Sequence, residues 1–486
     1  MKTNRVDRRL FLKSLSSVAM ASALPAYVFA AQTSIENVLD HGAVGNGTAL
    51  DTDAIQQAIT RCANRGGGTV LLPAGHTFVS GTLQLRSHVD LHIESGAVLK
   101  ASGNRDHFRK YGSLLFAEQA EGFSVSGQGT IDGNFSEFLK ERVDGGYKVL
   151  EPFLGLWDPL YDIPGKDHPD GRPRMILLVE SKAFSLADFT IRDSPTWTIH
   201  LLGCEQVHVS GLVIRNGMDV PNCDGIDIDH CRDVRIHDCD IAAGDDCLVL
   251  KTSRNFNQFG PCERVTITAC LLTSSSAAIK VEAEGSDTIR QAVIDNCVIR
   301  DSNRGICIAN RDGALVEEMV FSNMTIETSL RPEMWWGAGE AIQVTNLPRR
   351  AGMAPGIVRG LHFSNITCQS ESGIYLEGCQ QAPMADLSFN EIDLQLRHAS
   401  SLPGGVRDVR PVESQPGLYK SQIAAVYAEW INNLSLRGVR VQWSANVPDY
   451  FGAALEGHHL RNFHCENFSG HAAHNSSQDT ILDDVQ

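Results

Sequence analysis

The sequence predicts an all-β chain wound as a single-stranded, right-handed parallel β-helix, with one helix that caps its N-terminal end. Two observations predict this fold. Short segments of alternating apolar and polar residues recur from about residue 69 to residue 445, with turn residues between them. One amphipathic helical pattern comes before the first of these segments. A stacked coil extends its core with every repeat, so a chain of this length needs no division into several globular domains.

The capping helix is expected between residues 51 and 65. Asp-Thr-Asp at 51–53 can begin a helix, and Gly-Gly-Gly at 66–68 ends the pattern. Between them, the apolar residues at three- and four-residue spacing are Ile55, Ala58, Ile59 and Cys62. They form one stripe, which would cover the open end of the β-helix core.

The repeat itself is clearest in the middle of the chain. The segments that align are 234–241, 265–272, 292–299 and 320–326. Their equivalent apolar positions are Cys239, Cys270, Cys297 and Met324, which are 31, 27 and 27 residues apart. Most segments turn at Asn or Asp, and Asn tolerates the left-handed backbone that such turns use. A β-propeller is the alternative, but its units run to about 40 residues with a Trp-Asp signature that the sequence lacks.

Four segments follow from these patterns. Residues 1–31 carry Arg8-Arg9, an apolar run and small residues, which predict a twin-arginine export signal and a periplasmic or secreted protein. Residues 32–68 hold the capping helix, 69–466 the β-helix, and 467–486 a polar tail that we expect to fray. Insertions at 135–172 and 327–358 interrupt the repeats, and either could wall a groove. The second contains Trp335 and Trp336, which stack on sugar rings or pack against the coil.

Composition excludes several classes of partner. The formal net charge is −16 and residues 1–31 carry +4, which leaves −20 on the rest. This charge argues against nucleic acid and anionic membranes. No later segment reaches the ~18 apolar residues of a membrane span. The thirteen cysteines include no close metal-type pair, so buried free thiols are expected, with one or two disulfides as the alternative. No metal and no cofactor are predicted, and the oligomeric state is left open.

Three acidic residues carry the functional prediction. Asp224 lies one repeat before Asp245 and Asp246, so coil stacking would place their side chains together on one outer face. Three ionised carboxylates at that distance repel one another, which costs stability. Cleavage of a glycosidic bond requires such a group, because it needs one acid and one or two bases that activate water.

The surrounding motifs resemble glycoside hydrolase family 28, the polygalacturonase family of pectin-cleaving enzymes. The segments that carry the likeness are Ser-Pro-Thr-Trp-Thr-Ile-His at 194–200, Pro-Asn-Cys-Asp-Gly at 221–225 and Gly-Asp-Asp-Cys at 244–247. The resemblance implies a pectin lyase-like solenoid that hydrolyses with inversion. Asp245 would be the general acid, with a pKa raised by its neighbours, while Asp224 and Asp246 hold and deprotonate the water. Asn222 would orient a neighbour or the substrate. Inversion predicts a separation of about 6.5–9.5 Å between acid and base.

Two departures from the family pattern concern substrate binding. The family's Gly-His-Gly falls at 276–278, which reads Ser-Ala-Ala, and its carboxylate-binding Arg-Ile-Lys falls at 307–309, which reads Cys-Ile-Ala. Lys280, Arg304 and Arg311 lie nearby and are predicted to bind substrate instead. The alternative is that they pair with acidic neighbours, namely Glu282, Glu284 and Asp312. We interpret the changed clamp as a variant specificity: another galacturonate linkage, an exo mode, or a rhamnose-containing or otherwise decorated pectin.

The sequence therefore predicts an exported inverting glycoside hydrolase of a pectin-like, uronate-containing polysaccharide or oligosaccharide. A second hypothesis is a β-helix polysaccharide lyase, in which the aspartates bind Ca²⁺ and Lys280 or an arginine abstracts a proton. A third is a β-helix that binds carbohydrate without catalysis. Unsaturated products that absorb ultraviolet light would identify the lyase, and an Asp245→Asn variant with unchanged behaviour would identify the binding protein.

Overall fold

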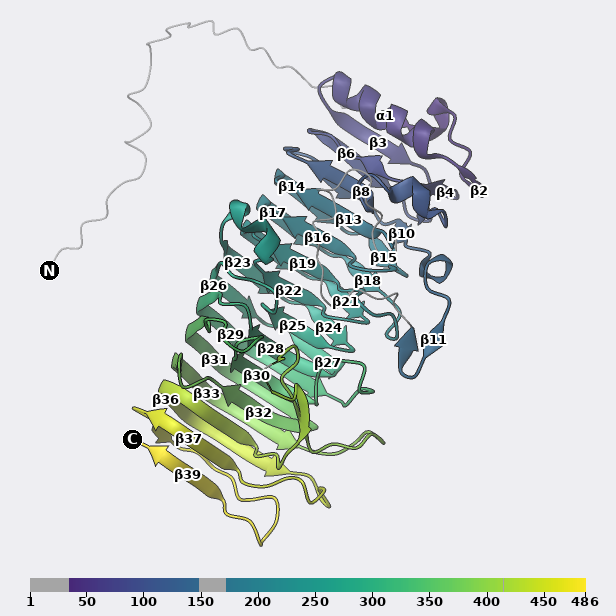
Figure 1. Ribbon diagram of the computed structural model, residues 1–486. Helices are drawn as coiled ribbons and strands as arrows, with labels where there is room; N and C mark the ends of the chain where they lie inside the picture. The colour runs from purple at the N-terminus through teal and green to yellow at the C-terminus, as the bar shows by residue number, and fades with distance from the viewer. Residues whose placement is uncertain (1–34, 148–171, 414) are drawn as a thin grey trace, which may run out of the picture. The chain divides into compact units, whose positions relative to one another are not determined.

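The computed structural model describes residues 35–147, 172–413 and 415–486. The predicted export signal at 1–31 and residues 148–171 of the predicted insertion at 135–172 lie outside this part of the chain. The described chain is a right-handed parallel β-helix, so the predicted fold class is confirmed (Figure 1). Within the described ranges, no helix combines the length and the apolar character that crossing a membrane demands.

Each coil contributes strands to three parallel sheets, and strands pair with their equivalents in the neighbouring coils. The first sheet contains β1 (Ile35–Asn37), β3 (Gly68–Leu72), β6 (Val89–Ile93), β9 (Ser124–Ser126), β14 (Lys182–Ala187), β17 (Glu205–Ser210), β20 (Arg232–His237), β23 (Cys262–Thr268), β26 (Thr288–Asp295), β29 (Leu315–Thr328), β31 (Ile357–Ser370), β33 (Met384–Leu396), β36 (Val426–Trp443) and β38 (His464–Glu466). The second sheet contains β2 (Asn46–Leu50), β4 (Thr77–Ser80), β7 (Val98–Ala101), β10 (Thr130–Asp132), β15 (Thr190–Arg192), β18 (Val213–Arg215), β21 (Asp240–Ala243), β24 (Leu271–Ser274), β27 (Val298–Ser302) and the later parts of the long strands β29, β31, β33 and β36.

The third sheet positions the candidate site. It contains β5 (Leu83–Gln84), β8 (Ser113–Glu118), β13 (Arg174–Val179), β16 (Ile199–Leu202), β19 (Ile226–Asp229), β22 (Leu248–Lys251), β25 (Ala277–Val281), β28 (Arg304–Asn310), β30 (Glu340–Asn346), β32 (Ser372–Glu377), the first part of β36, β37 (Leu455–Arg461) and β39 (Thr480–Val485). Alternate residues of these strands point into the core, and the others face outward.

Short elements lie outside the three sheets. The helices are α1 (Thr52–Asn64) and the 3₁₀ turns η1 (Val38–His41), η2 (Arg105–Phe108), η3 (Phe135–Glu137) and η4 (Arg254–Phe259). The two antiparallel pairs are β11 (Arg142–Val143) with β12 (Gly146–Tyr147), and β34 (Val406–Asp408) with β35 (Leu418–Lys420).

Helix α1 buries the stripe that the sequence predicted. Its core-facing residues, all fully buried, are Ile55, Ala58, Ile59 and Cys62. Asp51 does not cap the helix with its side chain. Its carboxylate instead accepts hydrogen bonds from the amides of Val44 and Gly45, at 2.6 and 3.1 Å, and so holds the preceding loop.

Register within the repeats follows the sequence alignment. Val234 pairs with Val265, and Val265 with Ala292, which stacks Cys239, Cys270 and Cys297 in the core. The turn residues Asn296, Asn323 and Asn365 have φ values of 52°, 55° and 53°, the left-handed backbone expected of them. Eleven of the thirteen cysteines are buried, and the structure places none of the thirteen in a disulfide.

Three aromatic rings form a continuous stack in the core. The centroids of Phe321 and Phe363 lie 4.9 Å apart and those of Phe363 and Phe389 lie 4.6 Å apart. All three side chains are buried. Because the middle ring fills the space between two coils, Phe363→Ala should lower the free energy of unfolding by about 3–5 kcal/mol. Urea unfolding followed by circular dichroism measures this loss. Val293→Ala on the exposed face of β26 is the control, and equal losses in both variants would contradict the role of the stack.

Two predicted boundaries were wrong. Residues 467–486 are not simply a frayed tail. They include β39, which pairs in parallel with β37 and adds a strand to the third sheet. The second insertion is shorter than residues 327–358, since β30 pairs with β28 and belongs to the coil. Parallel partners lie far apart in sequence, so a short polar strand at the end of a sheet gives little local signal.

Candidate active site

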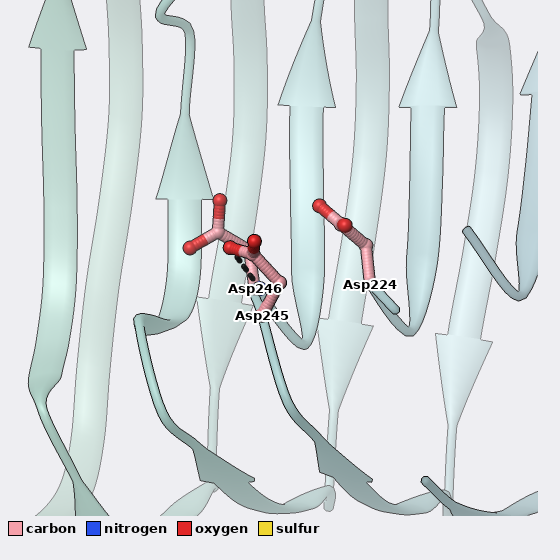
Figure 2. Close-up of side chains that lie close together, drawn as sticks. All are labelled: Asp224, Asp245 and Asp246. Carbon is pink, nitrogen blue, oxygen red and sulfur yellow. Dashed lines mark hydrogen bonds between the residues drawn. The ribbon is translucent and has the colours of Figure 1, made fainter. Parts of the chain in front are cut away.

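Three aspartates from neighbouring turns come together at the edge of the third sheet. Asp224 comes just before β19, and Asp245 and Asp246 lie in the turn between β21 and β22. One carboxylate oxygen of each residue lies within 4.8 Å of the other two (Figure 2). Asp224 and Asp246 are buried, and Asp245 is partly exposed. The structure thus brings the three predicted residues into one cluster that solvent reaches at Asp245.

Two glycines allow the backbones of these turns to approach each other. A Cβ atom on Gly225 would lie 2.3 Å from the carbonyl oxygen of Cys247, and one on Gly244 would lie 2.4 Å from that of Val220. No other residue fits at such a distance without moving the backbone. The Gly225 amide also donates a 2.9 Å hydrogen bond to the carbonyl of Asp246, which joins the two turns.

Backbone amides and one lysine hold two of the three carboxylates. Asp245 accepts hydrogen bonds from the amides of Asn222, at 3.2 Å, and Asp246, at 3.0 Å. Asp246 accepts from the amide of Ala277 at 2.9 Å, and Lys280 Nζ lies 3.4 Å from its other oxygen. Asp224 Oδ1 is buried and has no hydrogen-bond partner in the structure. This orphaned oxygen is where a bound water or substrate hydroxyl would be accepted.

The cluster retains a proton near neutral pH. Burial and, next, the charge of Asp246 raise the pKa of Asp245 to about 7. Burial and the charge of Asp245 also raise the pKa of Asp224 well above its usual range. Burial is therefore a larger cause than the like-charge repulsion that the sequence suggested. Asp246, which has a lysine partner, is the carboxylate whose surroundings best support a negative charge.

Inversion requires room for one water between the acid and the base. The nearest oxygens of the three carboxylates are within 4.8 Å of one another. A water that makes hydrogen bonds of about 2.7 Å to two carboxylates bridges oxygens up to about 5.4 Å apart. One water therefore fits between two of these groups.

Lys280 and Asn222 lie at the cluster, and each contacts one of its aspartates. Lys280 is the outward-facing residue of β25 in register with Val249 of β22, and its ammonium is buried against Asp246. Burial alone would lower the pKa of Lys280, but the charge of Asp246 acts in the opposite direction, and the pKa is raised. Asn222 contacts Asp245 through its backbone amide, and its φ of 58° is a left-handed conformation that Asn accepts readily.

Arg304 and Arg311 are buried away from any substrate, so we do not retain them as substrate-binding residues. Both side chains are 1% exposed. Arg304 Nε lies 3.2 Å from Glu340, and its Nη2 donates to the carbonyl of Asp408 at 2.5 Å. Arg311 donates to backbone carbonyls, including that of Val409 at 3.1 Å. The sequence could not reveal these partners, because Asp408 and Val409 lie about a hundred residues further along the chain.

Trp335 and Trp336 differ in their surroundings. Trp335 is buried and its Nε1 donates to the carbonyl of Gly145 at 3.2 Å. Trp336 is partly exposed, and Lys280 Nζ lies 5.9 Å from its ring centroid. Of the two indoles, only Trp336 can offer a face to a sugar ring beside the aspartates.

A second buried charge cluster was missed by the sequence analysis. Lys251 Nζ lies 3.4 Å from Asp227 and 3.2 Å from Glu284, and 4.0 Å from the ring centroid of Trp197. Burial, partly offset by Lys251, raises the pKa of Asp227 to about 7. Asp227 lies in β19, three residues after Asp224, and its charge helps to raise the pKa of Asp224, after burial and the charge of Asp245.

His200 and Asp229 extend this cluster. His200 Nε2 lies 3.2 Å from Asp229 Oδ2, and burial lowers the pKa of His200 to about 4, so the imidazole is neutral. Burial alone would raise the pKa of Asp229. The hydrogen bond with His200 acts in the opposite direction, and the pKa of Asp229 is lowered overall. The available signal in the sequence was charge inside an apolar strand, as in Ile226–Asp229 and Leu248–Lys251. Such residues face outward and mark a functional surface.

Among the described residues, the three aspartates are the group that could also share a cation. Ca²⁺ takes six to eight oxygen ligands, and the carboxylates supply only part of such a set. Their remaining surroundings are hydrogen-bond donors: the amides of Asn222 and Ala277 and the ammonium of Lys280. The donor set suits proton transfer to and from carboxylates better than a calcium site.

Comparison with known proteins agrees with this geometry. Residues 62–403 match the family described as glycosyl hydrolases family 28. A probable polygalacturonase of Vitis vinifera is 25% identical over 409 residues, covering 78% of each chain. An endo-polygalacturonase of Pectobacterium carotovorum subsp. carotovorum is 24% identical over 371 residues, covering 71% of this chain and 84% of that one. The fold is similar to that of a hyperthermoactive exopolygalacturonase from Thermotoga maritima, with a TM-score of 0.67, 21% identity, and coverage of 84% of this chain and 92% of the other. The chain belongs to glycoside hydrolase family 28.

Proposed function

We propose that this enzyme hydrolyses glycosidic bonds of a pectin-like, uronate-containing polysaccharide or oligosaccharide, and that Asp245 is its general acid. The single observation that carries the proposal is the cluster itself: three carboxylates within 4.8 Å, one of them with a pKa near 7. The polygalacturonases among its relatives support a uronate substrate. The altered residues at 276–278 and 307–309 support a specificity that differs from plain polygalacturonate in linkage, mode or decoration.

In the proposed reaction, Asp245 donates its proton to the glycosidic oxygen as the bond from that oxygen to the anomeric carbon breaks. A water held between Asp224 and Asp246 attacks the anomeric carbon from the opposite face. Asp246 takes the proton of this water, because Lys280 supports its charge. Asp224 orients the water with its free oxygen. After cleavage, Asp246 releases its proton to solvent and Asp245 takes up a new one, which restores the starting state.

Product stereochemistry tests this mechanism. With defined pectic oligosaccharides, NMR spectra taken within the first minutes should show a product whose anomeric configuration is opposite to that of the cleaved bond. Retention would contradict the water-attack mechanism. Unsaturated products with ultraviolet absorbance would show that the enzyme is a lyase and not a hydrolase.

Export is proposed from the leader alone. Arg8-Arg9 and the apolar run that follows support transport of the folded enzyme by the twin-arginine route to the periplasm or beyond. Replacement of both arginines by lysine should leave the enzyme in the cytoplasm. Unchanged export of that variant would contradict the proposal.

A further inference from the structure

On the outward face of the third sheet, the row of residues that contains Lys280 continues into the C-terminal coils. Beyond Lys280, the outward-facing residues in register on the next coils are Cys307, Gln343 and Tyr375. Their exposed fractions are 0, 0 and 4%. Residues at such positions on an outer sheet would meet solvent if nothing covered them. Another part of the chain therefore lies over the path that a polymer would follow from the triad toward the C-terminal coils.

The covering segment is residues 405–412, here called the strap, which includes β34. The carbonyl oxygen of Asp408 accepts hydrogen bonds from Gln343 Nε2, at 2.8 Å, and from Arg304 Nη2, at 2.5 Å. That of Val409 accepts from Arg311 Nη2 at 3.1 Å. The Arg407 guanidinium lies 4.2 Å from the ring centroid of Tyr375. Side chains of three successive coils thus bind the strap to the sheet.

The strap is also joined to the loop that carries Trp336. The amide of Gly337 donates to the Asp408 carboxylate at 2.8 Å. Arg410 pairs with the same carboxylate at 2.6 Å and donates to the carbonyl of Trp335 at 2.9 Å. These contacts involve charged and backbone groups that are largely buried, which makes the strap a fixed part of the fold rather than a loose loop.

The residues under the strap explain the altered sequence at 307–309. Ala277, Cys307 and Ala309 form a small buried cluster with no charged group of their own. Gln343 Oε1 accepts from Cys307 Sγ at 3.4 Å, so the thiol is capped from outside. A substrate carboxylate cannot reach these buried positions.

We propose that the strap closes the substrate groove on the C-terminal side of the triad, so that the enzyme cleaves galacturonate-containing chains from one end and releases a short product. This inference rests on the proposed glycosidase function. Neighbouring coils are about 4.8 Å apart, so the two steps from β22 to β28 leave about 10 Å, roughly the length of two sugar rings. The product is therefore a mono- or disaccharide.

Product analysis gives the first test. During hydrolysis of a pectic polymer, reducing ends should accumulate while the viscosity falls slowly, and chromatography should show mono- or disaccharide from the earliest times. A rapid fall in viscosity with products of intermediate length would overturn end-directed cleavage and leave the hydrolase assignment intact. An absence of hydrolysis would instead count against the proposed function, so the two failures are distinguishable.

Binding gives a test that does not depend on turnover. The Asp245→Asn protein is titrated with polygalacturonate of two mean lengths that differ about tenfold. If only chain ends bind, half-saturation by the shorter sample needs about tenfold less mass per volume. Equal mass concentrations at half-saturation would mean binding along the chain and would overturn the inference. Binding of neither sample would overturn it for galacturonate chains.

A matched pair of variants tests the strap itself. Arg410→Ala removes the link between the strap and the Trp335 carbonyl, whereas Arg350→Ala removes an exposed ion pair with Glu413 just beyond the strap. The share of products longer than a disaccharide should rise several-fold in Arg410→Ala and stay at the wild-type value in Arg350→Ala. An unchanged distribution in a folded Arg410→Ala protein would reject the strap as the barrier.

Discussion

Replacement of Asp245 by Asn is expected to lower kcat by roughly 10²–10⁴-fold while substrate binding survives. The amide keeps the shape of the carboxyl group but cannot deliver a proton to the departing oxygen. The hydrogen bonds from the amides of Asn222 and Asp246 can still be accepted by the amide oxygen, so the fold of the turn should persist. Initial rates on a pectic oligosaccharide and binding measured by calorimetry check both parts.

The pH dependence of the wild-type rate should reflect the protonation of Asp245. An acid must be protonated to act, and the pKa of Asp245 is raised to about 7. The rate should therefore fall as the pH rises through about 7, and this alkaline limb should disappear in Asp245→Asn. A limb that persists in the variant would assign it to another residue.

The leaving group of the substrate distinguishes the proposed general acid, Asp245, from the proposed base, Asp246. A uronide with a good leaving group, such as a nitrophenol, needs little help from a proton. Asp245→Asn should recover much of its rate on this substrate, whereas Asp246→Asn should not. Asp238→Asn is the control, because Asp238 is an exposed carboxylate in the same part of the coil. Wild-type turnover by Asp245→Asn on the natural type of substrate would remove this residue as the acid.

The repeat pattern was sufficient for the fold and for the triad, and the reason is geometric. A parallel coil sets neighbours by counting residues, so the spacing of Cys239, Cys270 and Cys297 already contained their register. The same counting placed Asp224 beside Asp245, because one coil separates them. Local periodicity therefore decides both the register of the coils and the meeting of the three aspartates, without any contribution from a distant segment.

The substrate-binding residues could not be predicted in this way. The sequence offered Arg304 either substrate or acidic residues close to it in the chain, yet Glu340 and the carbonyl of Asp408 hold it. Segments that cross the outer face of a coil obey no repeat, and their partners lie far along the chain. The same limit explains why Lys251, which lies on β22, was not recognised as part of a charge cluster with Asp227 and Glu284.

Lys280→Met is expected to lower kcat by roughly 10–100-fold and to move the pH optimum upward. The buried ammonium lies 3.4 Å from Asp246. Its charge also lowers the pKa of Asp245, although burial and Asp246 raise it more. Without the ammonium, Asp245 should keep its proton to a higher pH, and Asp246 would lose the cation that holds its carboxylate in place.

The choice of substrate decides between this role and direct carboxylate binding by Lys280. If Lys280 acts through Asp246, uronate and neutral substrates should lose the same factor in kcat, and KM should change little for both. A rise in KM confined to uronate substrates, with an unmoved pH profile, would instead return Lys280 to the substrate-binding role that the sequence suggested. Lys280→Arg keeps a cation beside Asp246 and should restore most of the pH profile, whereas Lys182→Met removes an exposed lysine and should change neither kcat nor the profile. A loss of kcat in Lys280→Arg as large as that in Lys280→Met would show that the shape of the side chain, and not its charge, supports the base.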